Sequence, residues 1–303
     1  MLRPAAALLG SLQRQRKLPF GSDCYRHWRY LPCSLGINRG CVRNVVTLLE
    51  EPPLDSPIPE RPCTVALVQD SLYGPASTSL WKAQLRSLVP TEFGMSFANL
   101  DLSHEQEKQQ GLLALDALQS DLLQMETPQV VLIARGPLVS WWAQLYLESF
   151  SLAGLVLVDP LVPVGDTGMG TVIDADAATN QAFQYVADEA RKNGSSNYLQ
   201  NISSLFFSKK RQRGLLLEPG AVPMMVLSTH PFLSEPAQQT AERHRIVYDG
   251  QDREDPSNPM FHLGDVPVIS MDLGEDNAGG SRVDPLQQCF RDTIGPWIEN
   301  QVL

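Results

Sequence analysis

The chain has 303 residues, of which 43% are hydrophobic and 19% charged, a composition that fits one large globular domain with extensions and excludes a chain too polar to bury a core. Residues 1–49 hold eight of the 24 Lys and Arg residues but only one acid, Asp23, so their net charge is +7 and that of residues 50–303 is −17. So acidic a body argues against nonspecific nucleic-acid binding, because it would repel phosphate groups.

The first 49 residues have the composition of a targeting sequence. They begin Met-Leu-Arg-Pro-Ala, are poor in acids and carry the basic group Arg14, Arg16 and Lys17. This pattern is typical of a transit peptide, so we expect import into the mitochondrial matrix; the alternatives are a plastid or a cytoplasmic location. No stretch reaches the roughly 18 uninterrupted apolar residues of a membrane span, so the mature protein is expected to be soluble.

The cysteines predict neither a disulfide framework nor a metal site. Cys24, Cys33 and Cys41 lie in the predicted leader, and Cys63 and Cys289 have no CxxC partner and no His-rich sequence beside them. We therefore expect no metal, and no motif indicates a cofactor.

A proline-rich linker over residues 50–62 leads into the predicted domain, residues 63–303. Short apolar runs predict strands, and amphipathic stretches between them predict helices. The predicted strands are 63–68, 97–102, 129–134, 152–158, 222–227 and 266–271, and the predicted helices are 79–88, 103–125, 137–150 and 282–303. Strands apolar on both faces that alternate with helices indicate a doubly wound, mostly parallel α/β sheet, with residues 165–219 as an inserted helical cap.

The central segments resemble the α/β-hydrolase family. Residues 130–146, Val-Val-Leu-Ile-Ala-Arg-Gly-Pro-Leu-Val-Ser-Trp-Trp-Ala-Gln-Leu-Tyr, followed by Gly-Leu-Val-Leu-Val-Asp-Pro at 154–160, are similar to that family's nucleophile-elbow strand and helix and its next strand. Residues 65–74 are similar to its oxyanion-loop strand. The resemblance implies an α/β-hydrolase-type sheet and places the nucleophile in the turn Ala134–Leu138.

The residues that this family uses for hydrolysis are missing at these positions. Gly136 stands where the nucleophile belongs, and Pro137 lacks the backbone N–H that would form half of the oxyanion hole. Asp70 in the oxyanion loop would repel a developing negative charge, and the expected histidine loop, 272–281, contains no His. These departures predict a degenerate elbow.

Four other residues are candidates for chemistry. Ser140 lies one helical turn past the elbow, His230 and His262 lie near predicted strand ends, and Asp159 ends a strand. Each has an ordinary structural interpretation: a buried serine, loop histidines and a carboxylate that bonds loop amides. The basic run 209–213 is interpreted as a solvated loop or, alternatively, as a docking site for an acidic partner, and Trp141 with Trp142 and Met224 with Met225 as core.

We therefore predict a catalytically degenerate α/β-hydrolase-fold protein of the mitochondrion. It would act as a binding or structural subunit, with an unknown protein partner or a small ligand under the cap, and not as an enzyme. The alternative is a serine hydrolase, esterase or acyltransferase with a relocated nucleophile, Ser140, assisted by His230 or His262. Assembly into a larger organellar complex is a third possibility, which predicts an exposed apolar patch.

Overall fold

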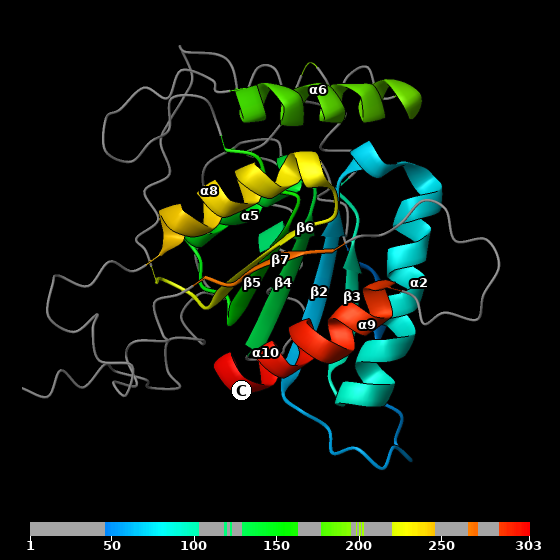
Figure 1. Ribbon diagram of the computed structural model, residues 1–303. Helices are drawn as coiled ribbons and strands as arrows, with labels where there is room; N and C mark the ends of the chain where they lie inside the picture. Colours follow the sequence, from blue (N-terminus) through cyan, green and yellow to red (C-terminus); the bar gives the residue numbers. More distant parts are fainter. Residues whose placement is uncertain are drawn as a thin grey trace, which may run out of the picture. The chain divides into compact units, whose positions relative to one another are not determined.

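The computed structural model describes residues 46–102, 118, 119, 122, 129–162, 177–194, 198, 200, 202, 220–245, 266–271 and 285–303. The chain divides between Val42 and Arg43, and all of these residues lie in its second part. Seven strands form one sheet in the order β1-β3-β2-β4-β5-β6-β7 (Figure 1). The strands are β1 (Val46–Glu50), β2 (Cys63–Gln69), β3 (Ser96–Leu100), β4 (Gln129–Arg135), β5 (Gly154–Val158), β6 (Met224–Ser228) and β7 (Val268–Ser270). Only β1 is antiparallel to its neighbour, β3.

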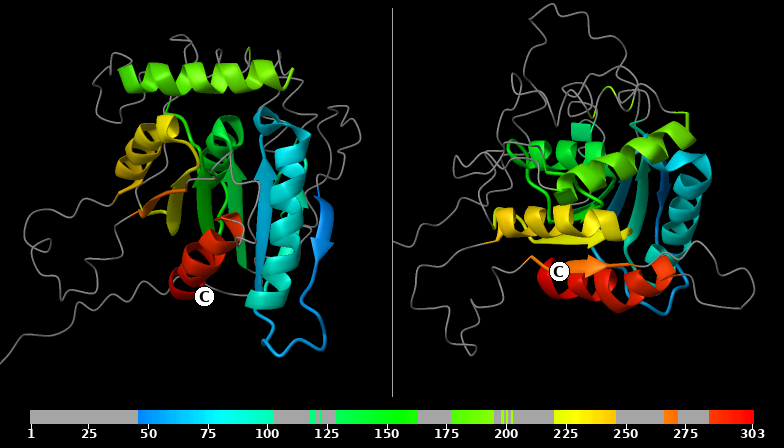
Figure 2. Two further views of the ribbon diagram at one scale, coloured as in Figure 1. Left: turned by 45° about the vertical axis from the view of Figure 1, so that its right-hand side comes forward. Right: turned by 45° about the horizontal axis from the view of Figure 1, so that its top comes forward.

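Helices cover both faces of the sheet, as the ribbon views show (Figures 1 and 2). On one face lie α2 (Gly74–Phe93) and a C-terminal helix made of α9 (Pro285–Cys289), the π-helical η5 (Phe290–Ile294) and α10 (Gly295–Gln301). On the other face lie α5 (Pro137–Leu147) and α8 (Ser234–His244). Two short 3₁₀ helices, η2 (Ser71–Tyr73) and η3 (Pro231–Leu233), follow β2 and β6.

Each central strand contributes side chains to two separate cores, because successive side chains of a strand point to opposite faces. In β2, Val65 and Leu67 pack with the core beneath α2, whereas Ala66 and Val68 pack with the core beneath α5. The same alternation holds along β4, β5 and β6, which explains why these strands are apolar at nearly every position.

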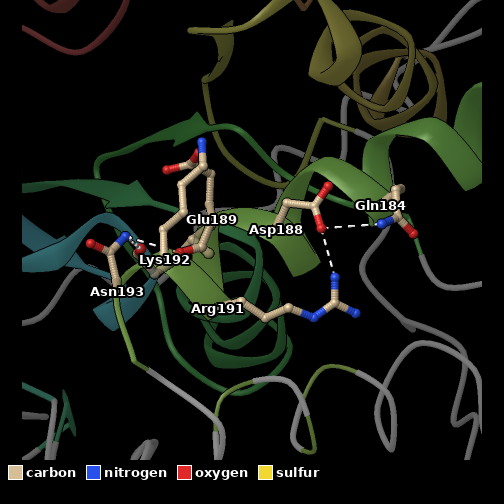
Figure 3. A network of polar contacts seen from close by, with 7 residues as sticks. Gln184, Asp188, Glu189, Arg191, Lys192 and Asn193 are labelled. Atoms are coloured by element: carbon tan, nitrogen blue, oxygen red, sulfur yellow. Dashed lines mark hydrogen bonds and ion pairs between the residues drawn. The ribbon is translucent and has the colours of Figure 1, made fainter.

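Helix α6 (Ala177–Lys192) lies across the carboxyl edge of the strands and contacts η2, η3 and α8 (Figure 1). Ala182, Val186 and Ala190, four residues apart, form its fully buried face. Its outer face carries side-chain pairs at helical spacing, Gln184 with Asp188 and Asp188 with Arg191 (Figure 3). Pairs so exposed add little stability.

One polar contact ties the end of α6 to the sheet edge. Asn193, directly after the helix, donates from Nδ2 to the carbonyl of Leu72 at 2.7 Å and to that of Glu189 at 3.1 Å (Figure 3). The amide therefore ends the helix and attaches it to η2, the turn that follows β2.

The sequence prediction of a mostly parallel α/β sheet covered by helices on both faces is confirmed. All six predicted strands are present. The sheet also contains β1, which precedes Cys63 and so extends the sheet further towards the N-terminus than predicted. Trp141, Trp142, Met224 and Met225 are core residues, as expected.

Several predicted features lie outside the described residues. They are most of the helix over 103–125, much of the cap over 165–219, the basic run 209–213, the loop 272–281 and nearly all of the predicted leader. Among the described helices, none combines the length and the apolar character needed to cross a membrane.

Candidate functional site

A tight turn joins β4 to α5 at the carboxyl edge of the sheet. Gly136 has φ 112° and ψ 160°, a conformation open to glycine, and Pro137 follows as the first helical residue. The Gly136 N–H donates to the carbonyl of Val158 at the end of β5, 2.8 Å away. A tight strand-to-helix turn in a mostly parallel, doubly wound sheet is the arrangement that the resemblance to the α/β-hydrolase family implies.

The space above this turn is filled by Asp70, the residue that follows β2. A Cβ atom built on Gly136 would lie 2.3 Å from the Asp70 Cβ and 2.9 Å from its Oδ2. Asp70 is fully buried. The position of a nucleophilic side chain is therefore occupied by a carboxyl group from the neighbouring strand. From the sequence we expected Asp70 only to disfavour an oxyanion, because nothing in the residue order shows which way its side chain turns.

Two donors hold the Asp70 carboxyl group. The Leu138 N–H, inside the first turn of α5, donates to Oδ2 at 2.9 Å, and the Tyr198 hydroxyl donates to the same oxygen at 2.8 Å. The other oxygen, Oδ1, is buried without a hydrogen-bond partner in the described part of the chain. Removal of the carboxyl group from water raises its pKa to about 7, and the bonds from Tyr198 and Leu138 only partly oppose this shift.

Asp159, a candidate acid or base, has a structural role in this arrangement. It is buried, with a positive φ of 54°, at the end of β5. Its Oδ1 accepts from the Thr229 N–H at 2.7 Å, and its Oδ2 accepts from the Thr229 and Tyr73 hydroxyls, each at 2.6 Å. The carboxylate therefore links β5 to the loop after β6 and to η2, and has no histidine partner among the described residues.

Arg135, which ends β4, is a buried cation that the sequence did not single out. Its guanidinium lies between two aromatic rings, 3.9 Å from the Tyr73 centroid and 4.4 Å from the Trp81 centroid. It donates to Gln69 Oε1 at 3.1 Å and to Ser77 Oγ at 2.8 Å. Burial lowers the Arg135 pKa, and the nearby Tyr73 and Asp159 only partly oppose this shift. An arginine guanidinium nevertheless stays charged in proteins. These contacts hold Arg135, the residue before Gly136, in place.

The structure does not join the candidate nucleophile Ser140 to His230, one of its two candidate bases. Ser140 is buried in α5, and its hydroxyl bonds to the carbonyl of Ala134 at 3.1 Å. His230 begins η3, where its Nδ1 accepts from the Phe232 N–H at 3.3 Å and its ring stacks on Tyr185, 4.0 Å between centroids. No hydrogen bond joins these two side chains, and His262 lies outside the described residues.

A different histidine, His244 at the end of α8, approaches the helix that carries Ser140. Its Nε2 lies 2.8 Å from Gln144 Oε1, and Gln144 in turn donates to the Ser140 carbonyl. Because an amide oxygen only accepts, Nε2 carries the proton. Burial lowers the His244 pKa to about 4, so the ring is neutral at physiological pH. The bond joins α8 to α5 and does not reach the Ser140 hydroxyl.

A polar pocket of about 450 Å³ opens beside the turn, at the ends of β2 and β3. Its walls come from the residues after these strands, from the first turns of α2 and from Asn193. Within the described ranges, no group of three or more His, Cys, Asp or Glu side chains could hold a metal ion.

No protein-family model matches the sequence, and neither does any curated protein. Among solved structures, the chain is similar to a proline iminopeptidase from Mycobacterium smegmatis, with 9% identity over 84% of this chain and 94% of that one and a TM-score of 0.47. A lipase in an open form is 12% identical over 84% of this chain and 93% of that one, with a TM-score of 0.45. A Pyrococcus furiosus esterase is 13% identical over 82% and 85%, with a TM-score of 0.45.

The packing of Asp70 on Gly136 predicts a large penalty for any side chain at the turn. We expect Gly136→Ala to lower the free energy of unfolding by on the order of 3 kcal/mol, because it adds both backbone strain and overlap with the Asp70 Cβ. Urea denaturation would measure this loss. Gly194→Ala is the strain-only control, because Gly194 has φ 69° but no atom within 4 Å of the added Cβ.

The same variant in an Asp70→Gly background separates the two contributions. With the Asp70 side chain removed, Gly136→Ala should cost clearly less than it does in the native chain, since only the backbone strain remains. An equal cost in both backgrounds would show that Asp70 does not fill the turn.

The buried carboxyl predicts a specific dependence of stability on pH. The Asp70 pKa is about 7 in the folded chain, against the ordinary 3.8 expected on unfolding, so the folded state holds the extra proton between these values. Stability from this group is therefore greatest below about pH 4 and declines up to about pH 7, by at most about 1.4 kcal/mol per pH unit.

Comparison with Asp70→Asn isolates this contribution. Unfolding free energies measured from pH 4 to 8 should show the variant gaining on the native chain as the pH rises, since the amide does not titrate; His244 is present in both proteins and cancels. Parallel curves would mean that Asp70 is ionised throughout.

Proposed function

We propose that this chain is a catalytically inactive α/β-hydrolase-type protein that acts as a binding or structural subunit in the mitochondrion. The observation that carries the proposal is the occupation of the nucleophile's position by the buried Asp70 side chain, packed against Gly136. Catalysis on this fold requires a reactive side chain exposed at the turn, with a base within hydrogen-bond reach.

The donors of the turn support this proposal. Pro137 has no N–H, and the N–H of Leu138 is engaged by the Asp70 carboxyl. A tetrahedral intermediate at this place would lack those donors and would meet a carboxyl group that becomes negative above pH 7. The sequence of the loop after β7, where the family places its base, contains no histidine over residues 272–281.

The alternative of a relocated nucleophile finds no support in the geometry. A serine acts as a nucleophile when a base accepts its proton at about 3 Å, with the hydroxyl open to substrate. Ser140 is fully buried, and its hydroxyl bonds to a backbone carbonyl. Among the described residues no histidine side chain bonds to it, and the nearby His244 is bonded to Gln144 instead.

Reaction with a fluorophosphonate probe tests the absence of an active serine. We expect the folded chain to remain unlabelled, as should a Ser140→Ala variant, with an active serine hydrolase labelled in parallel as the positive control. Mass spectrometry of the whole protein would detect an adduct. Labelling of the native chain that disappears in Ser140→Ala would overturn the proposal in favour of a hydrolase or acyltransferase.

The mitochondrial part of the proposal rests on the N-terminal charge pattern, and β1 limits where a leader could be cleaved. Residues 1–45 carry all eight basic residues of the predicted leader and its single acid. Since Val46 begins a strand paired with β3, we infer that a cleavage compatible with the sheet would occur before Val46.

Fusion of residues 1–45 to a fluorescent reporter tests this address. The reporter should accumulate in mitochondria, and replacement of Arg14, Arg16 and Lys17 by Gln should leave it in the cytoplasm, because import of a transit peptide depends on its positive charge. Fluorescence microscopy with a mitochondrial marker gives the readout. Plastid or diffuse fluorescence of the unmodified fusion would refute the mitochondrial assignment.

A further inference from the structure

We propose that the pocket at the ends of β2 and β3 binds a small hydroxylated organic anion, with Lys82 as the anchor for its carboxylate or phosphate group. This site deepens the binding role proposed above by naming a ligand class, and it does not use the turn at Gly136. For brevity we call it the β2–β3 pocket.

The position of the pocket suits a ligand. In open α/β sheets, ligands bind beyond the carboxyl ends of the strands, near the point where successive connections diverge to opposite sides. Here β3 lies on one side of β2 in the sheet, and β4, the next strand along the chain, lies on the other side of β2. The space directly between β2 and β4 is filled by Asp70 and Tyr198, and the pocket lies one strand away, between β2 and β3.

The volume is adequate for a metabolite. At about 450 Å³, the β2–β3 pocket falls within the range of roughly 300–1,000 Å³ that is usual for small-molecule sites. Gly74 and Pro75 at the start of α2 form part of its wall, so the positive end of the helix dipole lies at the pocket. The described residues of the wall come from segments that the sheet and α2 hold in place.

Lys82 gives the pocket its preference for an anion. Its side chain is partly buried in the pocket wall, on the third turn of α2, one turn beyond Thr78 and Ser79. Within the described part of the chain, Lys82 has no hydrogen bond or ion pair, whereas Arg86 one turn later pairs with Glu50 and Lys192 pairs with Glu189. An ammonium group without a partner in the wall of a pocket attracts a carboxylate or a phosphate.

The other lining groups indicate a hydroxylated ligand. Ser71, Thr78 and Ser79 contribute hydroxyls, and Asn99 and Asn193 contribute amides. The Asn193 amide is oriented by its bonds to the carbonyls of Leu72 and Glu189 (Figure 3). Because the Asn193 amide and the Thr78 hydroxyl already donate to backbone carbonyls, their oxygens are left to accept hydrogen bonds, which ligand hydroxyls can donate.

Two carboxyl groups also lie at the pocket and limit the affinity for an anion. Asp101 is exposed to solvent, which screens its charge. The Asp70 carboxyl is buried beneath the wall, and because burial raises its pKa to about 7 it is largely neutral in mildly acidic solution. Binding of malate should therefore be stronger at pH 6 than at pH 8, and this difference should disappear in Asp70→Asn. The Tyr198 and Tyr73 hydroxyls, which face Asp70, stay protonated in this range because burial raises their pKa. The phosphate probes do not serve for this comparison, since they gain negative charge themselves as the pH rises.

Titration calorimetry on the full chain tests the proposal, with glycerol 3-phosphate and inorganic phosphate as the phosphate probes and malate as the carboxylate probe. At least one probe should bind at millimolar concentration or below. Lys82→Gln should weaken that binding by about tenfold or more, as expected for loss of a charged hydrogen bond. Arg86→Gln removes a charge of the same sign from the same helix and should leave the affinity unchanged.

The pattern across probes identifies the ligand source: preference for the two phosphates indicates a phosphate ester, and preference for malate a hydroxy acid. Absence of binding by all three probes, or equal weakening in Lys82→Gln and Arg86→Gln, would overturn the proposal. Circular dichroism of both variants confirms folding. The outcome is independent of the fluorophosphonate result, so failure of this site and failure of the inactive-hydrolase proposal can be told apart.

Discussion

The close packing of Asp70 on Gly136 is the constraint on which the rest of the sheet edge depends. A carboxyl group occupies the space that a side chain at the turn would need, so the turn can be made only by glycine. Because the carboxyl is buried there, it must find donors, and it finds them in the first turn of α5 and in Tyr198 of the predicted cap. The Asp70 side chain therefore joins the loop after β2 to the start of α5 and to Tyr198.

The three buried charged groups around the turn are compensated to different degrees. Asp159 accepts three short hydrogen bonds from Tyr73 and Thr229, which offset its removal from water. Arg135 is held by two aromatic faces and by neutral acceptors. Asp70 has an unsatisfied oxygen and a raised pKa. A half-satisfied carboxyl costs stability, so Asp70 is the least well compensated of the three groups.

The sheet could be predicted from sequence because its central strands are buried on both faces, which makes them continuous apolar runs such as Val130–Ala134. Strand β1 could not be predicted from sequence, because it is a short edge strand that directly follows a basic segment. Its apolar residues were therefore assigned to the predicted leader. That the turn carries no nucleophilic side chain could be read from Gly136 and Pro137 alone. The side chain that fills the turn could not be predicted, because the approach of Asp70 depends on how the loop after β2 turns. The bond between His244 and Gln144 and the stacking of Arg135 could not be predicted either, because neither has a local sequence signal.

The filled turn and the β2–β3 pocket lie next to each other at the carboxyl edge of the sheet. The carboxyl edge of a parallel sheet is concave because strands end there and their connections diverge, so closing one part of it leaves another open. In this chain Asp70 and Tyr198 close the part between β2 and β4, while the wall from Ser71 to Lys82 borders an open polar space between β2 and β3. Asp70 lies at the boundary of both. Asp70 packs on Gly136 and also lines the β2–β3 pocket, so the packing of the turn and the shape of the pocket depend on the same side chain.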